Sequence, residues 1–172
     1  MKITSLEGVL EDELKDIYSA ESQLIKALPK MAKAAQSNDL RTAFEKHLEQ
    51  TRTHAQRIEE ICGDLKIRPR GKKCAGMEGL IEEGNEVLKS HADAEPLQAA
   101  LIGAAQRVEH YEIAAYGTAR AHARQLGYVK AVDLLSQTLE EEKETDRKLT
   151  HIAENRINVK AAMSDENMGQ GK

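Results

Sequence analysis

The chain has 172 residues, three prolines and 3% aromatic residues, so we expect one domain of ordinary size with an aliphatic core, and a β fold with many turns is disfavoured. Its net charge of −4 argues against a general nucleic-acid binder, and no apolar run reaches the roughly 18 residues of a membrane-spanning helix. The N-terminus has no apolar segment like that of a signal peptide, and two cysteines cannot build a disulfide framework, so we expect a cytoplasmic protein with reduced thiols.

The first two predicted helices form a hairpin. Thr4 and Glu7 match a capping box, which places the start of the first helix directly after Thr4. Apolar residues then follow at three- and four-residue spacing as far as Met31, so Pro29 is expected to kink this helix rather than to end it. The segment 37–40 has the composition of a turn, and a second helix is predicted from there to about residue 65.

The second half of the chain predicts a second hairpin. A basic loop follows the second helix, and a short helical segment spans about residues 77–91. A long helix is expected from Pro96, which suits a first helical turn, to Gly127, which is a natural stop. A last long helix follows, so that residues 1–156 form a single domain, and the polar residues 157–172 are expected to be a frayed tail.

This order of elements predicts an all-α fold. Two helical hairpins joined by a long crossover are typical of the ferritin-like four-helix bundle rather than of simple up-and-down bundles. At about 1.5 Å per residue, the short helix in the crossover can run back along much of the bundle.

Three carboxylates lie on helix faces that are otherwise apolar. At 100° per residue, Glu21 falls in the same stripe as Leu24, and Glu142 in the same stripe as Leu139. If the second hairpin turns at Gly127, Glu112 and Glu142 lie at equal distances along the chain on either side of the turn. Antiparallel helices place such positions at one height.

The first hairpin places further polar residues at the same height in the bundle. If it turns near Ser37, Glu21 and Thr53 are equally far from the turn along the chain, which brings Gln50 and His54 to the level of Glu21. His47 lies to one side of this face and is expected to be a core or interface histidine, with a supporting contact to the metal ligands as the alternative. The predicted polar layer contains Glu21, Gln50, His54, Glu112 and Glu142, with Glu109 and Asp146 at its edge.

The negative charge of such a layer must be neutralised, because burying a lone carboxylate costs several kcal/mol. The middles of these helix seams contain no lysine or arginine, which leaves protonation with mutual hydrogen bonds or a bound cation. Carboxylates and imidazole from four helices suit two iron or manganese ions. The competing interpretation is structural: a glutamate on an apolar stripe is usually partly exposed, and a hydrated polar layer without metal fits the same pattern.

Five stretches of the chain are similar to the YciE/YciF family of ferritin-like proteins, which is related to the rubrerythrins. They cover almost the whole chain except its tail: ELKDIYSAESQL (13–24), HLEQTRTH (47–54), KKCAGMEGLIEEGNEV (72–87), AAQRVEHYEIAAYGT (104–118) and TLEEEKETDRKLT (138–150). The resemblance implies a ferritin-like fold, homodimers, an association with stress responses and a di-iron or dimanganese centre.

The chain departs from the ferritin pattern, in which the second and fourth helices each carry Glu-x-x-His. The nearest equivalents here are Gln50 with His54 and Glu142 with Asp146. The neutral amide of Gln50 removes one anionic ligand from one of the two metal positions.

The predicted metal centre assigns a role to each residue. Glu112 and Glu142 are expected to bridge two ions, with Glu21 and His54 on one ion and Glu109 or Asp146 on the other. Tyr18 and Tyr111, which neighbour Glu21 and Glu112 along the chain, are the candidate catalytic phenols; the alternative for both is packing. The expected reaction is oxidation of ferrous iron by O2 or disposal of hydrogen peroxide.

Two other functions remain open. A non-enzymatic helical dimer that acts in stress by protein association would use the polar core as a specificity device. Iron storage would require a hollow shell of many subunits, which the sequence does not decide.

Overall fold

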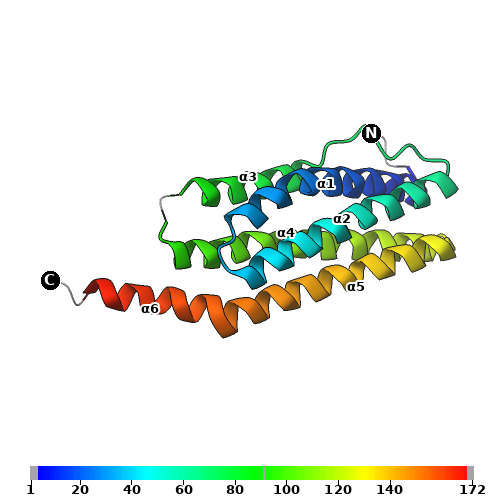
Figure 1. The fold of residues 1–172 in the computed structure, drawn as a ribbon. Coiled ribbons are helices and arrows are strands. Elements are labelled where there is room, and N and C mark those ends of the chain that lie inside the picture. Colours follow the sequence, from blue (N-terminus) through cyan, green and yellow to red (C-terminus); the bar gives the residue numbers. More distant parts are fainter. Residues whose placement is uncertain (1–3, 91, 170–172) are drawn as a thin grey trace.

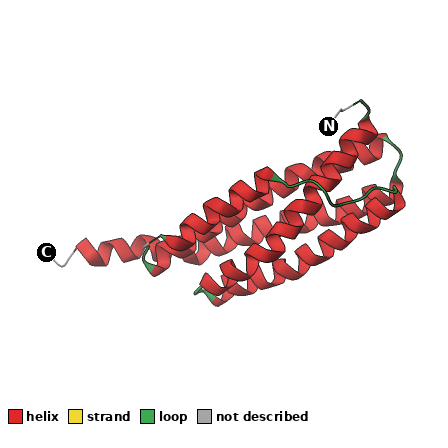
Figure 2. Ribbon diagram, turned by 90° about the horizontal axis from the view of Figure 1, so that it is seen from above, coloured by secondary structure: helices red, strands yellow, loops and turns green. Residues whose placement is uncertain are grey.

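The chain is built from helices in a computed structural model that describes residues 4–90 and 92–169 (Figure 1). The four long helices are α1 (Leu6–Ala34), α2 (Asn38–Asp64), α4 (Ala94–Gln125) and α5 (Val129–Ile152). The shorter elements are α3 (Ala75–Lys89), a π-helical turn η1 (Ala153–Ile157) and α6 (Asn158–Gly169). No strand occurs among the described residues (Figure 2). None of the helices in these residues is both long enough and apolar enough to cross a membrane.

The long helices form two hairpins, α1 with α2 and α4 with α5, which pack against each other. In this packing α1 lies against α4, and α2 lies against α5. Residues 65–74 and α3 carry the chain back along the outside of the bundle, where α3 packs on both α1 and α4 (Figures 1 and 2). A bundle with one such long crossover is ferritin-like, so the predicted all-α, ferritin-like four-helix fold is confirmed.

The start of α1 differs from the prediction by one residue. Ser5, and not Thr4, is the N-cap, because its backbone is extended and its hydroxyl oxygen accepts a hydrogen bond from the Gly8 backbone N–H at 3.2 Å. This bond satisfies one of the N–H groups that a helix leaves free at its N-terminus. The spacing of Thr4 and Glu7 suggested a capping box, but the hydroxyl that caps the helix comes one residue later.

The other helix ends lie close to the predicted ones, although α3 and α4 each begin two residues earlier, at Ala75 and Ala94. Helix α1 continues through Pro29. Gly127 has a φ of +74°, a left-handed conformation that glycine adopts without strain. The Gly127 N–H donates to the Arg124 carbonyl at 3.1 Å. The Tyr128 N–H donates to the Ala123 carbonyl at 3.0 Å. These bonds close α4 and fix the height at which α5 starts.

The C-terminal segment differs from the expected frayed tail. The chain continues from α5 through η1 into α6, which is helical as far as Gly169. Ile157 is buried in the same apolar cluster as Leu149 and Ile152, so η1 is held on the bundle by its own apolar side chains. Helix α6 then extends past the end of the bundle (Figures 1 and 2), and residues 170–172 of the predicted tail lie outside the described residues.

The apolar core is divided into two parts along the bundle. The part near the α1–α2 turn includes Leu28, Phe44 and Leu149. The part near the α4–α5 turn includes Leu14 and Leu135. A layer of buried polar side chains separates the two.

The first turn of α3 is fastened to Tyr111 of α4. The Tyr111 hydroxyl donates to Asp16 Oδ2 at 2.7 Å and lies 2.9 Å from Cys74 Sγ. Cys74 is also the N-cap of α3, and its sulfur accepts from the Met77 N–H. Gly76 leaves room for the ring, because a Cβ at this position would lie 2.7 Å from Tyr111 Cε2.

Replacing Gly76 therefore tests how α3 is attached. Gly76→Ala is expected to lower the free energy of unfolding by about 1–3 kcal/mol, because a ring held by two polar contacts must move. Gly79→Ala in the same helix, where the added Cβ meets no atom within 4 Å, is the matched control. The control is expected to raise this free energy by about 0.5–1 kcal/mol. Urea unfolding followed by circular dichroism measures both, and equal stabilities would contradict the close packing of α3 on Tyr111.

Candidate metal centre

Six ionisable side chains from the four long helices converge in the polar layer. They are Glu21 of α1, His47 and His54 of α2, Glu109 and Glu112 of α4, and Glu142 of α5. Each of them is at most 2% exposed. Both hairpins therefore contribute to one buried cluster, which we call the carboxylate cluster.

One group of donor atoms in the carboxylate cluster lies between α1, α2 and α5. Glu21, His54 and Glu142 each offer an atom within 4.8 Å of the others. His54 Nδ1 lies 2.8 Å from Glu142 Oε1 and 3.8 Å from Glu21 Oε1. These distances are short enough for the three side chains to ligate one ion.

A second group lies between α2, α4 and α5. Its members are His47, Glu109, Glu112 and again Glu142, with donor atoms that also lie within 4.8 Å of one another. His47 Nε2 lies 3.2 Å from Glu109 Oε1, and His47 Nδ1 lies 3.9 Å from Glu142 Oε2. Glu142 belongs to both groups, so its carboxylate lies within reach of both sets of donor atoms.

Helical geometry explains why these residues meet. His47 and His54 are seven residues apart, close to two full turns, so both point inward from α2. Glu109 and Glu112 lie on adjacent turns of α4 for the same reason. The turn at Gly127 then brings Glu112 and Glu142 together, as the register argument predicts.

Most polar atoms of the carboxylate cluster have no partner in hydrogen-bond geometry. Among the described residues, ten buried side-chain nitrogen and oxygen atoms lack one, and nine of these ten belong to the cluster. They include both carboxylate oxygens of Glu112 and of Glu142 and both ring nitrogens of His47. Since buried polar groups in proteins are nearly always paired, such a concentration is typical of a site that binds a ligand.

The protonation of the cluster reflects burial without a lysine or arginine partner. Its carboxylates form ion pairs with histidines alone within the described part of the chain. Burial and the neighbouring carboxylates raise the pKa values of Glu109 and Glu112 well above the usual range. Burial, opposed by His54, raises the pKa of Glu21 to about 8.

His54 and Glu142 form the charged pair of the cluster. Burial alone would lower the pKa of His54, but Glu142, Glu21 and Glu141 raise it to about 9. Burial alone would raise the pKa of Glu142, but His54 and His47 hold it below its usual value. Burial keeps the pKa of His47 below that of a free histidine. These shifts favour an ionised Glu142 beside a protonated His54 and favour the protonated forms of the other glutamates.

Contacts with Tyr116 and Glu141 orient two side chains of the cluster, Glu21 and His54. The buried Tyr116 hydroxyl donates to Glu21 Oε1, and the Tyr116 ring lies edge-on to His54 with centroids 6.3 Å apart. Glu141 Oε2 lies 2.8 Å from His54 Nε2. Arg57 fixes Glu141 with two hydrogen bonds of 2.6 and 3.0 Å. His54 is thereby held with Nδ1 facing the cluster, a common arrangement for histidine ligands.

Five of the seven ligands expected from the sequence meet in the cluster: Glu21, His54, Glu109, Glu112 and Glu142. Gln50 does not join them. It is partly exposed, because His47 and His54 define the inner face of α2 and Gln50 lies about 60° around the helix from that face.

Asp146 also stays outside the cluster. Its Oδ1 accepts a hydrogen bond from Gln106 Nε2 at 3.0 Å and lies 3.5 Å from His110 Nε2. Both partners are on α4, so the carboxylate ends in the α4–α5 seam. Of the two residues expected on this side, Glu109 or Asp146, only Glu109 lies in the cluster, together with His47.

The tyrosines expected to be catalytic phenols face away from the cluster. The Tyr18 hydroxyl donates to Glu59 across the α1–α2 seam at 2.6 Å. Tyr111 lies about 100° around α4 from Glu112 and binds Asp16 and Cys74 under α3. Both hydroxyl groups therefore lie outside the carboxylate cluster, which favours the alternative that the two tyrosines serve in packing.

Sequence reasoning did not assign two residues that touch the cluster. His47 was expected to be a core or interface histidine, although its spacing of two turns from His54 was a usable signal. Tyr116 follows Glu112 by four residues, which places it on the same face of α4. The sequence pattern did not single it out, because alanines such as Ala115 and Ala119 occupy the same apolar face of α4.

A four-helix bundle with one long crossover and a core rich in glutamate and histidine defines the ferritin-like class of protein. Within that class, residues 5–162 match the family described as "Domain of unknown function (DUF892)", and the chain belongs to this family. Protein YciF of Escherichia coli K12 is 50% identical over 162 residues, which cover 94% of this chain and 98% of that protein.

Solved structures agree with this assignment. The crystal structure of the E. coli stress protein YciF matches with a TM-score of 0.88 over 91% of this chain and 99% of that one. YcfI from Rhodopseudomonas palustris, described as a putative structural protein, is 42% identical, with a TM-score of 0.84 over 87% of this chain and 95% of that one. A Xanthomonas campestris protein, 23% identical with a TM-score of 0.75 over 95% of this chain and 99% of that one, shares the fold.

The free energy of unfolding of the metal-free protein is expected to fall as pH rises from 6.5 to about 9. Glu21, Glu109 and Glu112 have folded pKa values above their unfolded ones, so the stability they contribute at low pH is lost as pH rises through the folded values. His54, with a folded pKa of about 9, acts in the same direction. His47 acts in the opposite direction, but only below its unfolded value of 6.5. Urea unfolding across this pH range, in the presence of a chelator, measures the slope.

Glu112→Gln is expected to flatten this pH dependence, because it removes one of the titrating groups. Glu144→Gln, on the exposed face of α5, is the control that keeps the wild-type slope. A wild-type stability that increases with pH in this range would contradict the assigned protonation states.

Proposed function

We propose that the protein is a ferritin-like oxidoreductase whose carboxylate cluster binds two divalent iron or manganese ions and reacts with O2 or hydrogen peroxide. The observation that carries this proposal is the pair of donor groups that share Glu142. The description of the E. coli relative as a stress protein supports a role under stress. Ferrous iron oxidation or peroxide disposal is the chemistry that would serve such a role.

The donor set fits two such ions in charge and in kind. Four carboxylates and two neutral imidazoles carry four negative charges when fully deprotonated, which two divalent cations neutralise. Oxygen donors mixed with imidazole suit iron and manganese. Glu21 and His54 would hold one ion, His47, Glu109 and Glu112 the other, and Glu142 would bridge them. This assignment replaces Gln50 and Asp146 of the sequence prediction with His47.

The chain's own residues would position and insulate the centre. When bound, the ions would supply the exchange of electrons with O2 or peroxide. Tyr116 holds one oxygen of Glu21, and Arg57 holds Glu141 against His54 Nε2. Glu141 is partly exposed, so it connects the buried imidazole with the surface. The apolar parts of the core on either side of the layer exclude bulk water.

The association hypothesis retains one specific support, because the relative from R. palustris is described as a putative structural protein. The two functions differ in what Glu142→Leu would do. Under the metal hypothesis this variant loses metal uptake and turnover. Under the association hypothesis it keeps or raises stability, since a buried charged layer is often replaced by apolar residues without loss.

Metal titration of the chelator-treated protein tests the proposal. Wild type is expected to bind two equivalents of Fe2+ or Mn2+, measured anaerobically by calorimetry and confirmed by elemental analysis. Glu21→Gln is expected to bind one equivalent, because Glu21 belongs to one donor group only. Glu142→Gln, which affects both groups, is expected to weaken both equivalents at least about tenfold.

Glu144→Gln serves as the control because it removes a carboxylate from the exposed face of the same helix. It is expected to bind metal like the wild type. Less than about 0.2 equivalents of iron plus manganese in reconstituted wild type would exclude the dimetal function.

A further inference from the structure

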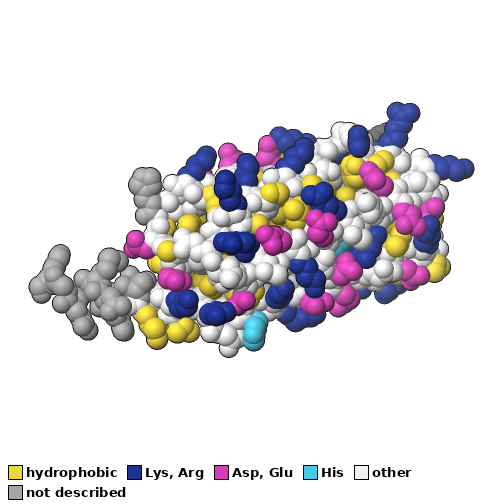
Figure 3. Space-filling view, in the orientation of Figure 1, with side chains coloured by type: hydrophobic (Ala, Val, Ile, Leu, Met, Phe, Trp, Pro, Cys, Tyr) yellow, Lys and Arg dark blue, Asp and Glu magenta, His cyan; other side chains and the backbone are white. Residues whose placement is uncertain are grey.

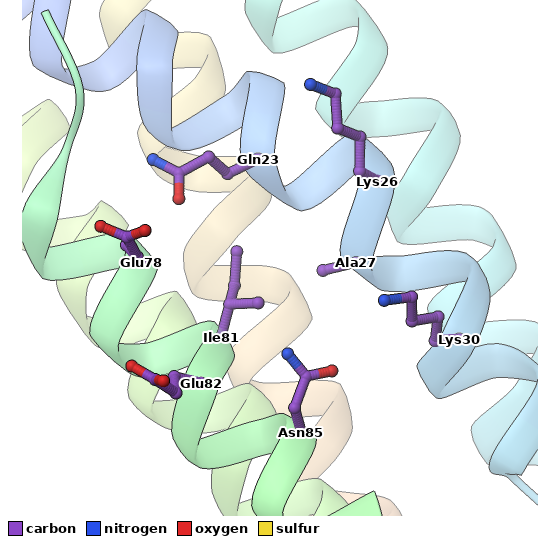
Figure 4. Close-up of a pocket in the computed structure, with 8 residues that line it drawn as sticks. All are labelled: Gln23, Lys26, Ala27, Lys30, Glu78, Ile81, Glu82 and Asn85. Carbon is purple, nitrogen blue, oxygen red and sulfur yellow. The ribbon is translucent and has the colours of Figure 1, made fainter.

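A surface groove lies between α1 and α3, on the side of the bundle that α3 covers. Figure 4 shows Ile81 of α3 and Ala27 of α1 between the two helices, with Lys26 and Lys30 on one side and Glu78 and Glu82 on the other. The groove has a volume of about 340 Å³. Figure 3 shows that charged side chains of both signs lie beside apolar ones over this part of the surface.

A small apolar cavity lies beneath this groove. It has room for about 20 Å³ and shares Ala27, Ile81 and Asn85 with the groove above it. Apart from Asn85, its walls are apolar side chains and a glycine: Leu24, Ala27, Met31, Leu80, Ile81, Gly84, Leu88, Ala104 and Val108. The groove and the cavity are therefore adjacent, with the side chains of Ala27, Ile81 and Asn85 between them.

A second cavity, separated from the first by side chains that line both, reaches the carboxylate cluster. It has room for about 10 Å³ and shares Leu24, Met31 and Val108 with the first cavity. Its far end is lined by His47 and Glu109, and its other walls are mainly apolar. His47 has two ring nitrogens without a hydrogen-bond partner at this end.

We propose that the groove and the two cavities form the entry route for dioxygen to the His47–Glu109 side of the carboxylate cluster. This inference rests on the proposed function and names which of its two oxidants the protein admits. The two cavities have room for about 10 and 20 Å³, close to the volume that holds one water molecule, so only small molecules pass between them, and only when the side chains that line both cavities move. A charged or strongly hydrogen-bonding molecule would lose its hydration in an apolar passage, whereas O2 loses almost none.

Met31 and Val108 are the residues that control passage, since both line the two cavities. Met31 is partly exposed and flexible, so rotamer changes of its thioether open and close the contact between the cavities. Val108 is stiff at χ1 and lies next to Glu109 on α4. A larger side chain at position 108 would close the passage, and a smaller one at position 31 would widen it.

Xenon binding to the metal-free full-length protein tests the route without any turnover. Xenon enters small dry apolar cavities, and its NMR chemical shift reports the binding. Xenon is larger than either cavity, so wild type is expected to bind it weakly, and Met31→Ala, which enlarges both cavities, is expected to bind it more strongly. Val108→Phe is expected to bind no xenon. Val132→Phe, which changes the other part of the core, is the control and is expected to behave like the wild type. Equal xenon binding by Met31→Ala and Val108→Phe would overturn the proposal.

Oxidation of the ferrous-loaded protein tests the choice of oxidant. Stopped-flow mixing with O2 is expected to show a rate at least about tenfold lower in Val108→Phe than in Val132→Phe, with two equivalents of metal bound in each. Met31→Ala is expected to react with O2 faster than wild type. Equal O2 rates in Met31→Ala, Val108→Phe and wild type would overturn the route, and so would a peroxide reaction slowed as much as the O2 reaction. If wild type binds no metal, the proposed function fails, whereas the xenon result still decides whether the passage exists.

Discussion

The structure depends on the burial of four glutamates in a helical core where histidines are their only ionic partners among the described residues. An isolated carboxylate in such a place is strongly destabilised, so each one must be protonated, paired or bound to a cation. The core uses the first two devices when no cation is bound: Glu142 pairs with His54, and the raised pKa values of Glu109 and Glu112 keep protons on them. Because cations would displace these protons, metal affinity and pH are linked.

The polar layer also fixes how the two hairpins fit together. It separates two apolar parts of the core, so a shift of one hairpin by a helical turn would move Glu142 toward one of these apolar parts and away from His54. The turn at Gly127 sets the register of α4 and α5, and the charged contacts of His54 set that of α2 against α5. Turn geometry and core electrostatics therefore favour the same arrangement, which is the consistency expected of a natural sequence.

Helix α3 is more than a connection between the hairpins. One end of it is held by Gly76, Cys74 and the hydroxyl of Tyr111, so its position on α1 and α4 is closely defined. Further along, small residues such as Gly84 and Ala104 line the apolar cavity beneath it. The same helix thus covers the bundle and forms one wall of this cavity.

The sequence by itself determined the helices, the two hairpins and most of the carboxylate cluster. Apolar periodicity located the buried stripes, glycine marked the second turn, and equal distances from that turn brought Glu112 and Glu142 together. It did not decide the roles of residues at the edge of a stripe, because one position along a helix changes direction by about 100° and a long side chain can follow either seam. Tyr18, Tyr111, Gln50 and Asp146 turned to neighbouring helices or the surface, while His47 and Tyr116 turned inward. Only the tertiary structure decided these directions, because they depend on which helix lies opposite and which polar partner it presents.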